Sequence, residues 1–486
     1  MRLGELIRGL EVLEVHGDLG VEIADISSDS RLIKGGELFV AIRGERADGH
    51  NFLQEAISRG ARALLVEDPP SGIGVPWVRV GDTRVALGEV ASRFYGRPSL
   101  GLKVVGITGT NGKTTSCYIL ESILKAYGAK VGVIGTVSYR WMDQQREAQN
   151  TTPSSLELQR LLKEMLDSGV SYVVMEVSSH ALVQRRLKGC HFDVGIFTNI
   201  SPEHLDYHGT MQEYLRAKAL FFQEVLKESQ KDPWAIYNAD DPKVREVVEG
   251  VEGLKGLGFG MGGLVRPLGW RADPQGISFK LETPKGLLEA RSKLIGYHNL
   301  YNIMAAVSAA IILDVPTEAI CQGIEGLRGV PGRLERVSER PKVFVDYAHT
   351  PDALKKALEA LRPLARGKLI VVFGCGGERD RSKRPLMGKI ASLMASLTVI
   401  TSDNPRGEDP MAIIGEIRAG IQPGAPYLVI PDRREAIREA IRRAEEEDVV
   451  LIAGKGHEAY QIIGSERYPF DDRQEARKAL EEFGWI

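Results

Sequence analysis

Runs of apolar residues that end in glycine- or serine-rich turns recur over the central part of the chain, and each is followed by helical periodicity. Four of these runs are KVVGITGTNGKTT from Lys103, YVVMEVSSH from Tyr172, VGIFTNISPEH from Val194 and WAIYNADDP from Trp234. Continuous apolar strands that alternate with helices are typical of a parallel sheet covered on both faces. Because ligands of such sheets bind at the carboxyl ends of the strands, we expect the polar clusters that follow these strands to converge.

Shorter segments on both sides of this part also alternate strands with helices. Before residue 99 the pattern predicts strands over 38–42 and 63–66 and a helix over 52–59. Four further apolar runs follow residue 331, and the charged stretch 432–448 fits a helix with an apolar inner face. Gly and Pro interrupt the chain between these parts, in YGRPS from Tyr95 and GVPGR from Gly329.

These observations predict an α/β protein with three domains. A central domain with a P-loop-type parallel sheet is flanked by a small N-terminal α/β domain and a C-terminal Rossmann-like α/β domain. The predicted bounds are 1–98, 99–330 and 331–486. The length of 486 residues requires more than one domain, since a single hydrophobic core stops growing at about 250 to 300 residues.

The composition is that of a soluble globular protein and excludes several kinds of partner. Hydrophobic residues make up 43% of the chain and charged residues 26%. With 63 Lys and Arg against 65 Asp and Glu, the net charge is −2, so no global field would attract nucleic acid or an anionic membrane. The four cysteines lie far apart, and the charged N-terminus lacks the apolar core of a signal peptide. We expect a cytoplasmic monomer with no nucleic-acid partner and no membrane insertion.

The strongest chemical signal is a glycine-rich loop, GITGTNGKTT from Gly106, between a strand and a predicted helix over 116–126. Its glycines let backbone N–H groups approach phosphate oxygens, while Lys113 supplies a cation and Thr114 a hydroxyl for Mg²⁺. The spelling departs from the general G-x-x-x-x-G-K-[ST] pattern, because Ile107 stands five residues before Gly112. Strand, loop and helix together predict the binding of a nucleoside triphosphate.

The motif TGTNGKTT resembles the ATP loop of the Mur ligases and their folylpolyglutamate synthetase relatives, and the resemblance extends over essentially the whole chain. It implies an ATP-dependent enzyme that forms an amide bond through an acyl phosphate, with ADP and phosphate as the other products. Standing alone, the asparagines of the HNLYN element would be read as helix caps. The ATP-binding residues that the resemblance implies are Gly109, Thr110, Asn111, Gly112, Lys113, Thr114, Thr115, Asn299, Asn302, Arg333, Asp346 and His349.

The resemblance also implies a catalytic set of Lys113, Glu176, His204 and Lys218. Magnesium prefers oxygen ligands beside phosphates, which suits Glu176 together with Thr114. In the family, the histidine that matches His204 helps to hold Mg²⁺, and the lysine that matches Lys218 is carbamylated to N6-carboxylysine, which is also a metal ligand. From sequence alone, Lys218 would be read as a surface residue and His204 as a structural histidine.

Several short polar elements resemble the family's contacts to a UDP-linked muramoyl peptide, UDP-MurNAc-L-Ala-D-Glu. Those in the N-terminal part are also ordinary turn sequences. Hydroxyl groups and arginine suit the recognition of carboxylate and diphosphate. The residues implied are Ser28, Ser30, Glu45, Arg46, Ala47, Asn150, Thr151, Thr152, Ser178, Gln184 and Arg186.

The tetrapeptide D-N-P-R that ends at Arg406 is a turn by composition, but in the family it marks the members that add meso-diaminopimelate. Diaminopimelate differs from lysine by a distal carboxylate, which an arginine can bind through two hydrogen bonds. The residues implied in binding it are Arg379, Asp403, Asn404, Pro405, Arg406, Gly454 and Glu458.

Other functions remain compatible with parts of this pattern. A lysine-adding Mur ligase or folylpolyglutamate synthetase would share the ATP loop, although D-N-P-R and the UDP-like elements speak against both. A phosphotransferase or regulatory ATPase would use the loop without forming an amide, and a non-catalytic nucleotide-binding module would not need the set around Glu176. Because the three implied sites lie on separate domains, we expect domain closure when substrates bind.

Overall fold

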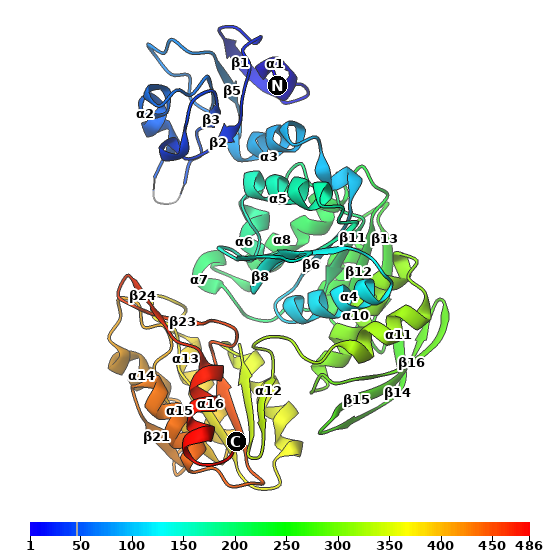
Figure 1. Ribbon diagram of the computed structural model, residues 1–486, viewed down its shortest axis with the longest axis vertical. Coiled ribbons are helices and arrows are strands. Elements are labelled where there is room, and N and C mark those ends of the chain that lie inside the picture. Colours follow the sequence, from blue (N-terminus) through cyan, green and yellow to red (C-terminus); the bar gives the residue numbers. More distant parts are fainter. Residues whose placement is uncertain (45–46) are drawn as a thin grey trace.

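In a computed structural model, which describes residues 1–44 and 47–486, the chain forms three α/β domains in a row. Figure 1 shows the N-terminal domain at one end of the long axis, the central domain in the middle and the C-terminal domain at the other end. The predicted three-domain α/β fold is confirmed, whereas the predicted bounds at residues 98 and 330 stay a prediction. Two predicted substrate-binding residues, Glu45 and Arg46, lie outside the described residues.

The N-terminal domain has a five-stranded sheet in the order β1-β5-β4-β3-β2, in which β1 is antiparallel to β5 and the other pairs are parallel. The predicted strands over 38–42 and 63–66 correspond to β3 and β4, and the predicted helix over 52–59 corresponds to α2. The elements are α1 (Leu3–Leu6), β1 (Val12–His16), β2 (Ile26–Ser27), β3 (Leu38–Val40), α2 (Leu53–Ser58), β4 (Ala63–Val66), β5 (Trp77–Val80) and α3 (Thr83–Phe94).

The central domain has an eight-stranded sheet in the order β13-β12-β11-β6-β10-β7-β8-β9, of which the first six strands are parallel. This confirms the predicted parallel sheet and places the loop after β6 in its middle. The strands are β6 (Lys103–Thr108), β7 (Val131–Ile134), β8 (Ser138–Trp141), β9 (Gln144–Glu147), β10 (Tyr172–Glu176), β11 (Val194–Phe197), β12 (Trp234–Asn238) and β13 (Lys255–Phe259). A separate antiparallel sheet consists of β14 (Arg266–Asp273), β15 (Gly276–Thr283) and β16 (Gly286–Ser292).

Helices cover both faces of the central sheet because its strands are apolar on both sides. Val105 and Ile107 of β6 belong to the core formed with α4 and α10, whereas Val104 belongs to the core formed with α5. The helix predicted over 116–126 begins three residues earlier, at Lys113. The helices are α4 (Lys113–Ala126), α5 (Ser155–Asp167), α6 (Ser179–Val183), α7 (Leu205–His208), α8 (Met211–Leu220), α9 (Pro242–Glu249), α10 (His298–Ile312) and α11 (Thr317–Gly326).

The C-terminal domain has a six-stranded sheet in the order β17-β18-β22-β19-β20-β21, parallel except for β17. A two-stranded hairpin, β23 and β24, follows the sheet. The elements are β17 (Glu335–Glu339), β18 (Lys342–Asp346), α12 (Pro351–Leu361), β19 (Leu369–Phe373), α13 (Lys383–Met394), β20 (Leu397–Ile400), α14 (Pro410–Arg418), β21 (Tyr427–Val429), α15 (Arg433–Arg442), β22 (Val449–Ala453), β23 (Tyr460–Ile463), β24 (Glu466–Pro469) and α16 (Asp472–Glu482).

None of the helices in the described part of the chain combines the length and the apolar character needed to cross a membrane.

Candidate active site between the central and C-terminal domains

A cavity of about 610 Å³ lies at the carboxyl end of the central sheet, where the C-terminal domain meets the central one. Its walls include the glycine-rich loop, the ends of β10 and β11, the start of α10 and the segment from Asp346 into α12. The strand ends thus converge as the apolar pattern predicts. Of the predicted catalytic and ATP-binding residues, the cavity is lined by Thr110, Asn111, Gly112, Lys113, Thr114, Thr115, Glu176, His204, Lys218, Asn299, Asn302, Arg333, Asp346 and His349.

Two glycines give the loop its shape. Gly109 has a φ of 140°, and a Cβ there would lie 1.9 Å from Thr198 Oγ1. Gly112 has a φ of 91°, and a Cβ there would lie 2.2 Å from Asn302 Oδ1. Both positions therefore require glycine for backbone conformation and for space. Gly112 directly precedes α4, so backbone N–H groups and the helix N-terminus point at the cavity together.

Two lysines donate to the same carbonyl oxygen of this loop. Lys113 Nζ lies 2.8 Å from Gly109 O and 2.9 Å from Thr110 O, while Lys218 Nζ lies 2.9 Å from Gly109 O. The Lys218 side chain is fully buried, so the interpretation from sequence alone as a surface residue is wrong. Burial and the charge of Lys113 lower the pKa of Lys218 well below its usual value, against the opposing effect of Glu203.

Glu176 is buried at the end of β10 and is held by hydroxyl and amide donors. Thr114 Oγ1 lies 3.0 Å from each carboxylate oxygen, and Thr136 donates its N–H at 2.9 Å and its hydroxyl at 3.0 Å. A carboxylate beside a hydroxyl at the phosphate loop fits Mg²⁺, which binds one or two carboxylates and completes its shell with phosphate oxygens and water. No group of three or more His, Cys, Asp or Glu among the described residues could hold a metal by itself.

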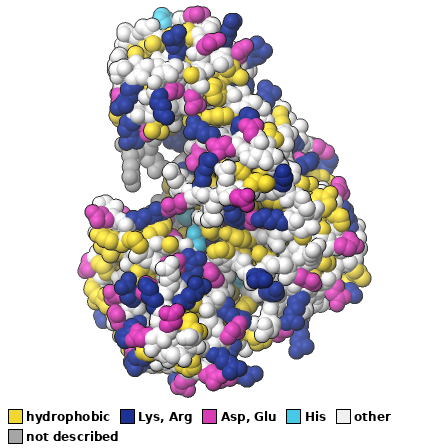
Figure 2. Space-filling model, in the orientation of Figure 1, with side chains coloured by type: hydrophobic (Ala, Val, Ile, Leu, Met, Phe, Trp, Pro, Cys, Tyr) yellow, Lys and Arg dark blue, Asp and Glu magenta, His cyan; other side chains and the backbone are white. Residues whose placement is uncertain are grey.

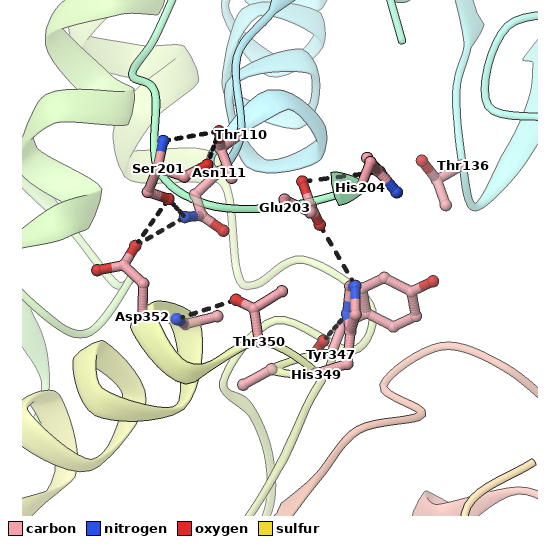
Figure 3. Close-up of polar contacts among 12 residues, drawn as sticks. Thr110, Asn111, Thr136, Ser201, Glu203, His204, Tyr347, His349, Thr350 and Asp352 are labelled. Atoms are coloured by element: carbon pink, nitrogen blue, oxygen red, sulfur yellow. Dashed lines mark hydrogen bonds and ion pairs between the residues drawn. The ribbon is translucent and has the colours of Figure 1, made fainter. Parts of the chain in front are cut away.

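Glu203 and His204 also line the cavity and lie on the segment after β11 (Figure 3). Burial raises the pKa of Glu203, but the hydrogen bond from His349, the charge that His204 carries only at acid pH and the charge of Lys113 outweigh it and hold this pKa far below the usual value. For His204, burial together with the charges of His180 and the nearby lysines lowers the pKa to about 3, against the opposing charge of Glu203. The imidazole is therefore neutral and can act as a ligand or hydrogen-bond partner.

The C-terminal domain reaches the loop through several side chains. Arg333 Nη2 lies 3.2 Å from Thr114 Oγ1, and its guanidinium stands 4.4 Å from the Tyr347 ring centroid. Asp346 is anchored by the backbone N–H groups of Leu334 and Ala348 at 2.7 and 2.8 Å. On the central side, Asn302 Nδ2 donates to Asn299 Oδ1 at 2.8 Å and Asn299 Nδ2 to the Ile295 carbonyl at 2.7 Å. Neither asparagine is the N-cap of α10, which is Tyr297.

The residues predicted to bind diaminopimelate lie together at the carboxyl ends of β19, β20 and β22. Asn404 Nδ2 donates to Glu458 Oε2 at 3.0 Å, and the buried Lys455 donates to Asn404 Oδ1 at 2.9 Å and to Glu458 at 3.1 Å. Gln461 Nε2 donates to the Asp403 carbonyl at 2.6 Å. Gly454 has a φ of 116°, and a Cβ there would meet Asp403 Oδ2 at 2.6 Å. Pro405 and Arg379 flank the same turn around Gly376 and Gly377.

Arg406 contributes an uncompensated charge to this cluster. Its Nη1 donates to the Gly377 carbonyl at 2.8 Å, and the pair β23–β24 holds its backbone through Ile462 O at 3.1 Å. Neither Arg406 nor Arg379 forms an ion pair with any carboxylate among the described residues. Burial and the charge of Arg379 lower the pKa of Arg406, against the opposing charges of Asp403, Glu458 and Glu378. An anion bound beside the two arginines would offset the repulsion between them.

The predicted contacts to the UDP-linked peptide fall into two groups. Thr152 Oγ1 donates to Glu176 O at 2.8 Å and accepts from Ser178 N at 3.0 Å, and Arg186 donates to Thr152 O at 2.8 Å. Asn150, Thr151 and Gln184 belong to the same region. In contrast, Ser28, Ser30 and Ala47 lie in the N-terminal domain and do not line the cavity. Figure 2 shows the outline hollowed between the N-terminal and C-terminal lobes.

Sequence reasoning missed Glu203, Thr136, Tyr214 and Tyr347, all of which line the cavity. Glu203 directly precedes His204, and Tyr347 directly follows Asp346. The available signal was that each of these two residues is adjacent to a predicted site residue. The sequence does not show, however, which of two adjacent side chains points into the cavity. Thr136 could not be found this way, because it follows a strand without any motif.

Known proteins are similar to this chain along its full length. Sequence models described as Mur ligase family, catalytic domain, as Mur ligase middle domain and as Mur ligase, glutamate ligase domain match residues 22–95, 107–310 and 332–456. The UDP-N-acetylmuramoyl-L-alanyl-D-glutamate--2,6-diaminopimelate ligase of Geobacter metallireducens is 46% identical over 99% of both chains. The protein of the same name from Geobacillus kaustophilus is 45% identical over 100% of both. A solved structure of an enzyme with that name superposes with a TM-score of 0.72 at 32% identity, covering 100% of this chain and 99% of that one.

Proposed function

The chain belongs to the Mur ligase family, and from this premise we propose that it adds meso-diaminopimelate to UDP-N-acetylmuramoyl-L-alanyl-D-glutamate in the synthesis of the peptidoglycan precursor. Members of this family are ATP-dependent ligases that form amide bonds. The proposed location is the cytoplasm and the proposed active form is the monomer. The observation that carries the proposal is Arg406, which forms no ion pair with the described residues and belongs to the same domain that supplies Arg333 and His349 to the cavity around Lys113, Glu176 and Lys218.

The first chemical step is the activation of a carboxylate. A carboxylate oxygen of the UDP-linked peptide attacks the γ-phosphorus of ATP, and ADP leaves. The nucleotide loop and Lys113 hold and neutralise the phosphates, so that catalysis rests on positioning and charge stabilisation. Thr114 and Glu176 are the residues that would hold Mg²⁺, which supplies further positive charge beside the transferred phosphoryl group. Thr152, Ser178 and Arg186 lie beside Glu176 and suit the peptide carboxylate and its neighbours.

The second step forms the amide bond. The neutral amine of diaminopimelate attacks the acyl phosphate carbon and a tetrahedral intermediate forms. The nitrogen then releases a proton to solvent, and phosphate leaves with the electrons of its bond to carbon. The Glu458 carboxylate, held by Asn404 and Lys455, offers an acceptor for an ammonium group. Arg406 and Arg379 offer cationic donors for the distal carboxylate. A substrate without that carboxylate would leave the arginine unpaired, which is why we expect lysine to be a poor substrate.

The buried state of Lys218 supports its proposed carbamylation. CO₂ reacts with a neutral amine, and burial beside Lys113 lowers the pKa of Lys218, which increases the neutral fraction at physiological pH. The resulting carbamate is an anion with oxygen donors. It would lie next to the cation of Lys113 and within the shell proposed for Mg²⁺, together with His204.

A competition assay tests the proposed function. The purified protein is given ATP, Mg²⁺, UDP-MurNAc-L-Ala-D-Glu and an equimolar mixture of meso-diaminopimelate and lysine, and the products are weighed by mass spectrometry. We expect the diaminopimelate tripeptide to dominate, with ADP formation that depends on both the peptide and the amino acid. Preferential lysine addition would overturn the choice of amino acid but not the ligase class. ATP hydrolysis without any amide product would overturn the ligase function.

A further inference from the structure

Asp352 lies on the C-terminal domain but bonds to the nucleotide loop of the central domain (Figure 3). It occupies the first turn of α12, two residues after the N-cap Thr350. Its Oδ2 accepts from Asn111 Nδ2 at 2.9 Å and from Ser201 Oγ at 3.4 Å, and Lys356 Nζ lies 2.7 Å from the same atom. One carboxylate oxygen therefore joins its own helix to two segments of the neighbouring domain.

Asn111 is the point at which the loop is held from both domains. Its backbone N–H donates to Asn199 Oδ1 at 3.0 Å, and its carbonyl accepts from Thr198 Oγ1 at 2.7 Å and Asn199 Nδ2 at 3.0 Å. These central-domain bonds fix the backbone of the residue. Among the described residues of the central domain, the side-chain amide bonds only to Ser201 Oγ, at 3.4 Å, and the shorter bond to Asp352 Oδ2 at 2.9 Å holds it in place.

The segment that Asp352 contacts also carries catalytic groups. Ser201 N donates to Thr110 Oγ1 at 3.0 Å, and two residues further on Glu203 Oε1 lies 3.4 Å from His349 Nε2. Figure 3 shows His349 and Asp352 of the C-terminal domain facing opposite ends of this short segment. Contacts at both ends fix its orientation relative to the C-terminal domain, and with it the position of His204.

We infer that Asp352 is a positioning residue that orders the Asn111 corner of the nucleotide loop when the C-terminal domain docks. The inference rests on the proposed function for its kinetic consequence. Asp352 acts through Asn111 and Ser201, because donors from these residues and from Lys356 converge on its Oδ2. Asp352 thereby couples docking of the C-terminal domain to the geometry of the nucleotide loop during phosphoryl transfer. Small displacements of the reacting groups have large effects on the rate of such a step.

Steady-state kinetics with two variants and a control test this role. In Asp352→Ala the acceptor is lost, and we expect kcat to fall by about tenfold while KM for ATP changes by less than about twofold, because the central-domain bonds to Asn111 remain. Asp352→Asn keeps an acceptor oxygen and should recover most of kcat. Glu445→Ala, which removes an exposed partner of Lys368 elsewhere on the C-terminal domain, should match the unaltered protein.

Hydrogen exchange of the protein with a non-hydrolysable ATP analogue provides a readout that needs no product. Asp352→Ala should exchange faster in peptides covering 109–112 and 199–203, with no change in β19, whereas Asp352→Asn should resemble the unaltered protein. Unchanged kcat or unchanged exchange of 109–112 in Asp352→Ala would overturn the inference. An increase in KM for ATP alone would also overturn it, because it would assign Asp352 to nucleotide binding. If the unaltered protein makes no amide, the proposed function fails, while the exchange result still decides the role of Asp352.

Discussion

The two junctions between domains are built from different kinds of contact. At the first, α3 of the N-terminal domain packs against the central domain so closely that a Cβ on Gly88 would lie 2.5 Å from Lys188 O. Gly189, with a φ of 75°, approaches Gly88 O equally closely. At the second, side chains meet: Arg333 with Thr114, Asp352 with Asn111, and His349 with Glu203.

This difference indicates which junction opens. Backbone segments in direct contact are part of a packed interior, which does not deform gradually. Hydrogen bonds and ion pairs between partly exposed side chains contribute only about 0.5 to 1.5 kcal/mol each and can be exchanged for water. The cavity lies at the second junction. We therefore expect the N-terminal and central domains to move as one body and the C-terminal domain to open for substrate exchange.

Replacing Lys218 should have the largest effect, because it changes the chemistry inside the cavity and leaves both junctions intact. We expect Lys218→Ala to lower kcat by about a thousandfold, a typical cost of losing a charge-stabilising group in a closed site. Binding of ATP, measured by calorimetry, should persist, since Lys113 and the loop remain. Lys285→Ala, which removes an exposed lysine paired with Asp314, is the control. Near-normal turnover of Lys218→Ala would exclude a catalytic role for this lysine.

Replacing Arg406 should affect only the proposed amino-acid site of the C-terminal domain. We expect Arg406→Ala to lower kcat/KM for diaminopimelate by about a hundredfold to a thousandfold, because a charge-assisted pair with the distal carboxylate is lost. The KM for ATP should stay the same, and lysine should be used no worse than before. The kcat/KM of Arg406→Lys for diaminopimelate should lie between those of Arg406→Ala and the unaltered protein, since a lysine keeps the charge but cannot form the paired hydrogen bonds of a guanidinium. Equal losses for both amino acids would remove Arg406 from the determinants of specificity.

The sequence predicts the two regions of the site unequally. Around the nucleotide loop, strand, glycines and Lys113 are local in the chain, so composition and periodicity alone indicate a phosphate site. Lys218 and Arg406 carry no such signal. Lys218 becomes buried only because the loop after β6 and helix α8 come together at Gly109. Arg406 forms no ion pair with the described residues because three strand ends and a hairpin, distant in the sequence, surround it. Such long-range consequences of packing are reached from sequence only through family resemblance.

The elements themselves are predicted closely where the pattern is strong. Ala436, Ile437, Ala440, Ile441 and Ala444 are buried as the stretch 432–448 predicts. The helix α15 nevertheless ends at Arg442, so the prediction of a helix throughout this stretch is wrong at its C-terminal end. Beyond it Asp448 accepts from the backbone N–H groups of Glu445 and Lys368, which holds this part as a turn leading into β22.

The first junction can be tested with a single methyl group. We expect Gly88→Ala to lower the free energy of unfolding by about 2 to 3 kcal/mol, because the added Cβ meets backbone atoms of Lys188 that cannot turn away. Gly415→Ala is the matched control: this glycine also lies inside a helix, α14, and a Cβ there would meet nothing within 4 Å. It should be neutral or stabilising by up to about 1 kcal/mol. Chemical denaturation measures both, and equal effects would mean that the first junction is looser than its contacts indicate.

The second junction should also respond to pH through His298, at the start of α10. Burial and the nearby charge of Lys356 lower the pKa of His298 to about 4, against the opposing effect of Asp352. When the pKa of a histidine is lower in the folded protein than in the unfolded chain, its contribution to stability is complete above the unfolded-state pKa of about 6.5. This contribution is lost as the pH falls towards the folded-state pKa. Between about pH 7 and pH 5.5, His298→Gln should therefore lose about 1 kcal/mol less unfolding free energy than the unaltered protein. Denaturant titrations at both pH values measure the difference, and identical losses would show that His298 is as easily protonated in the folded protein as in the unfolded chain.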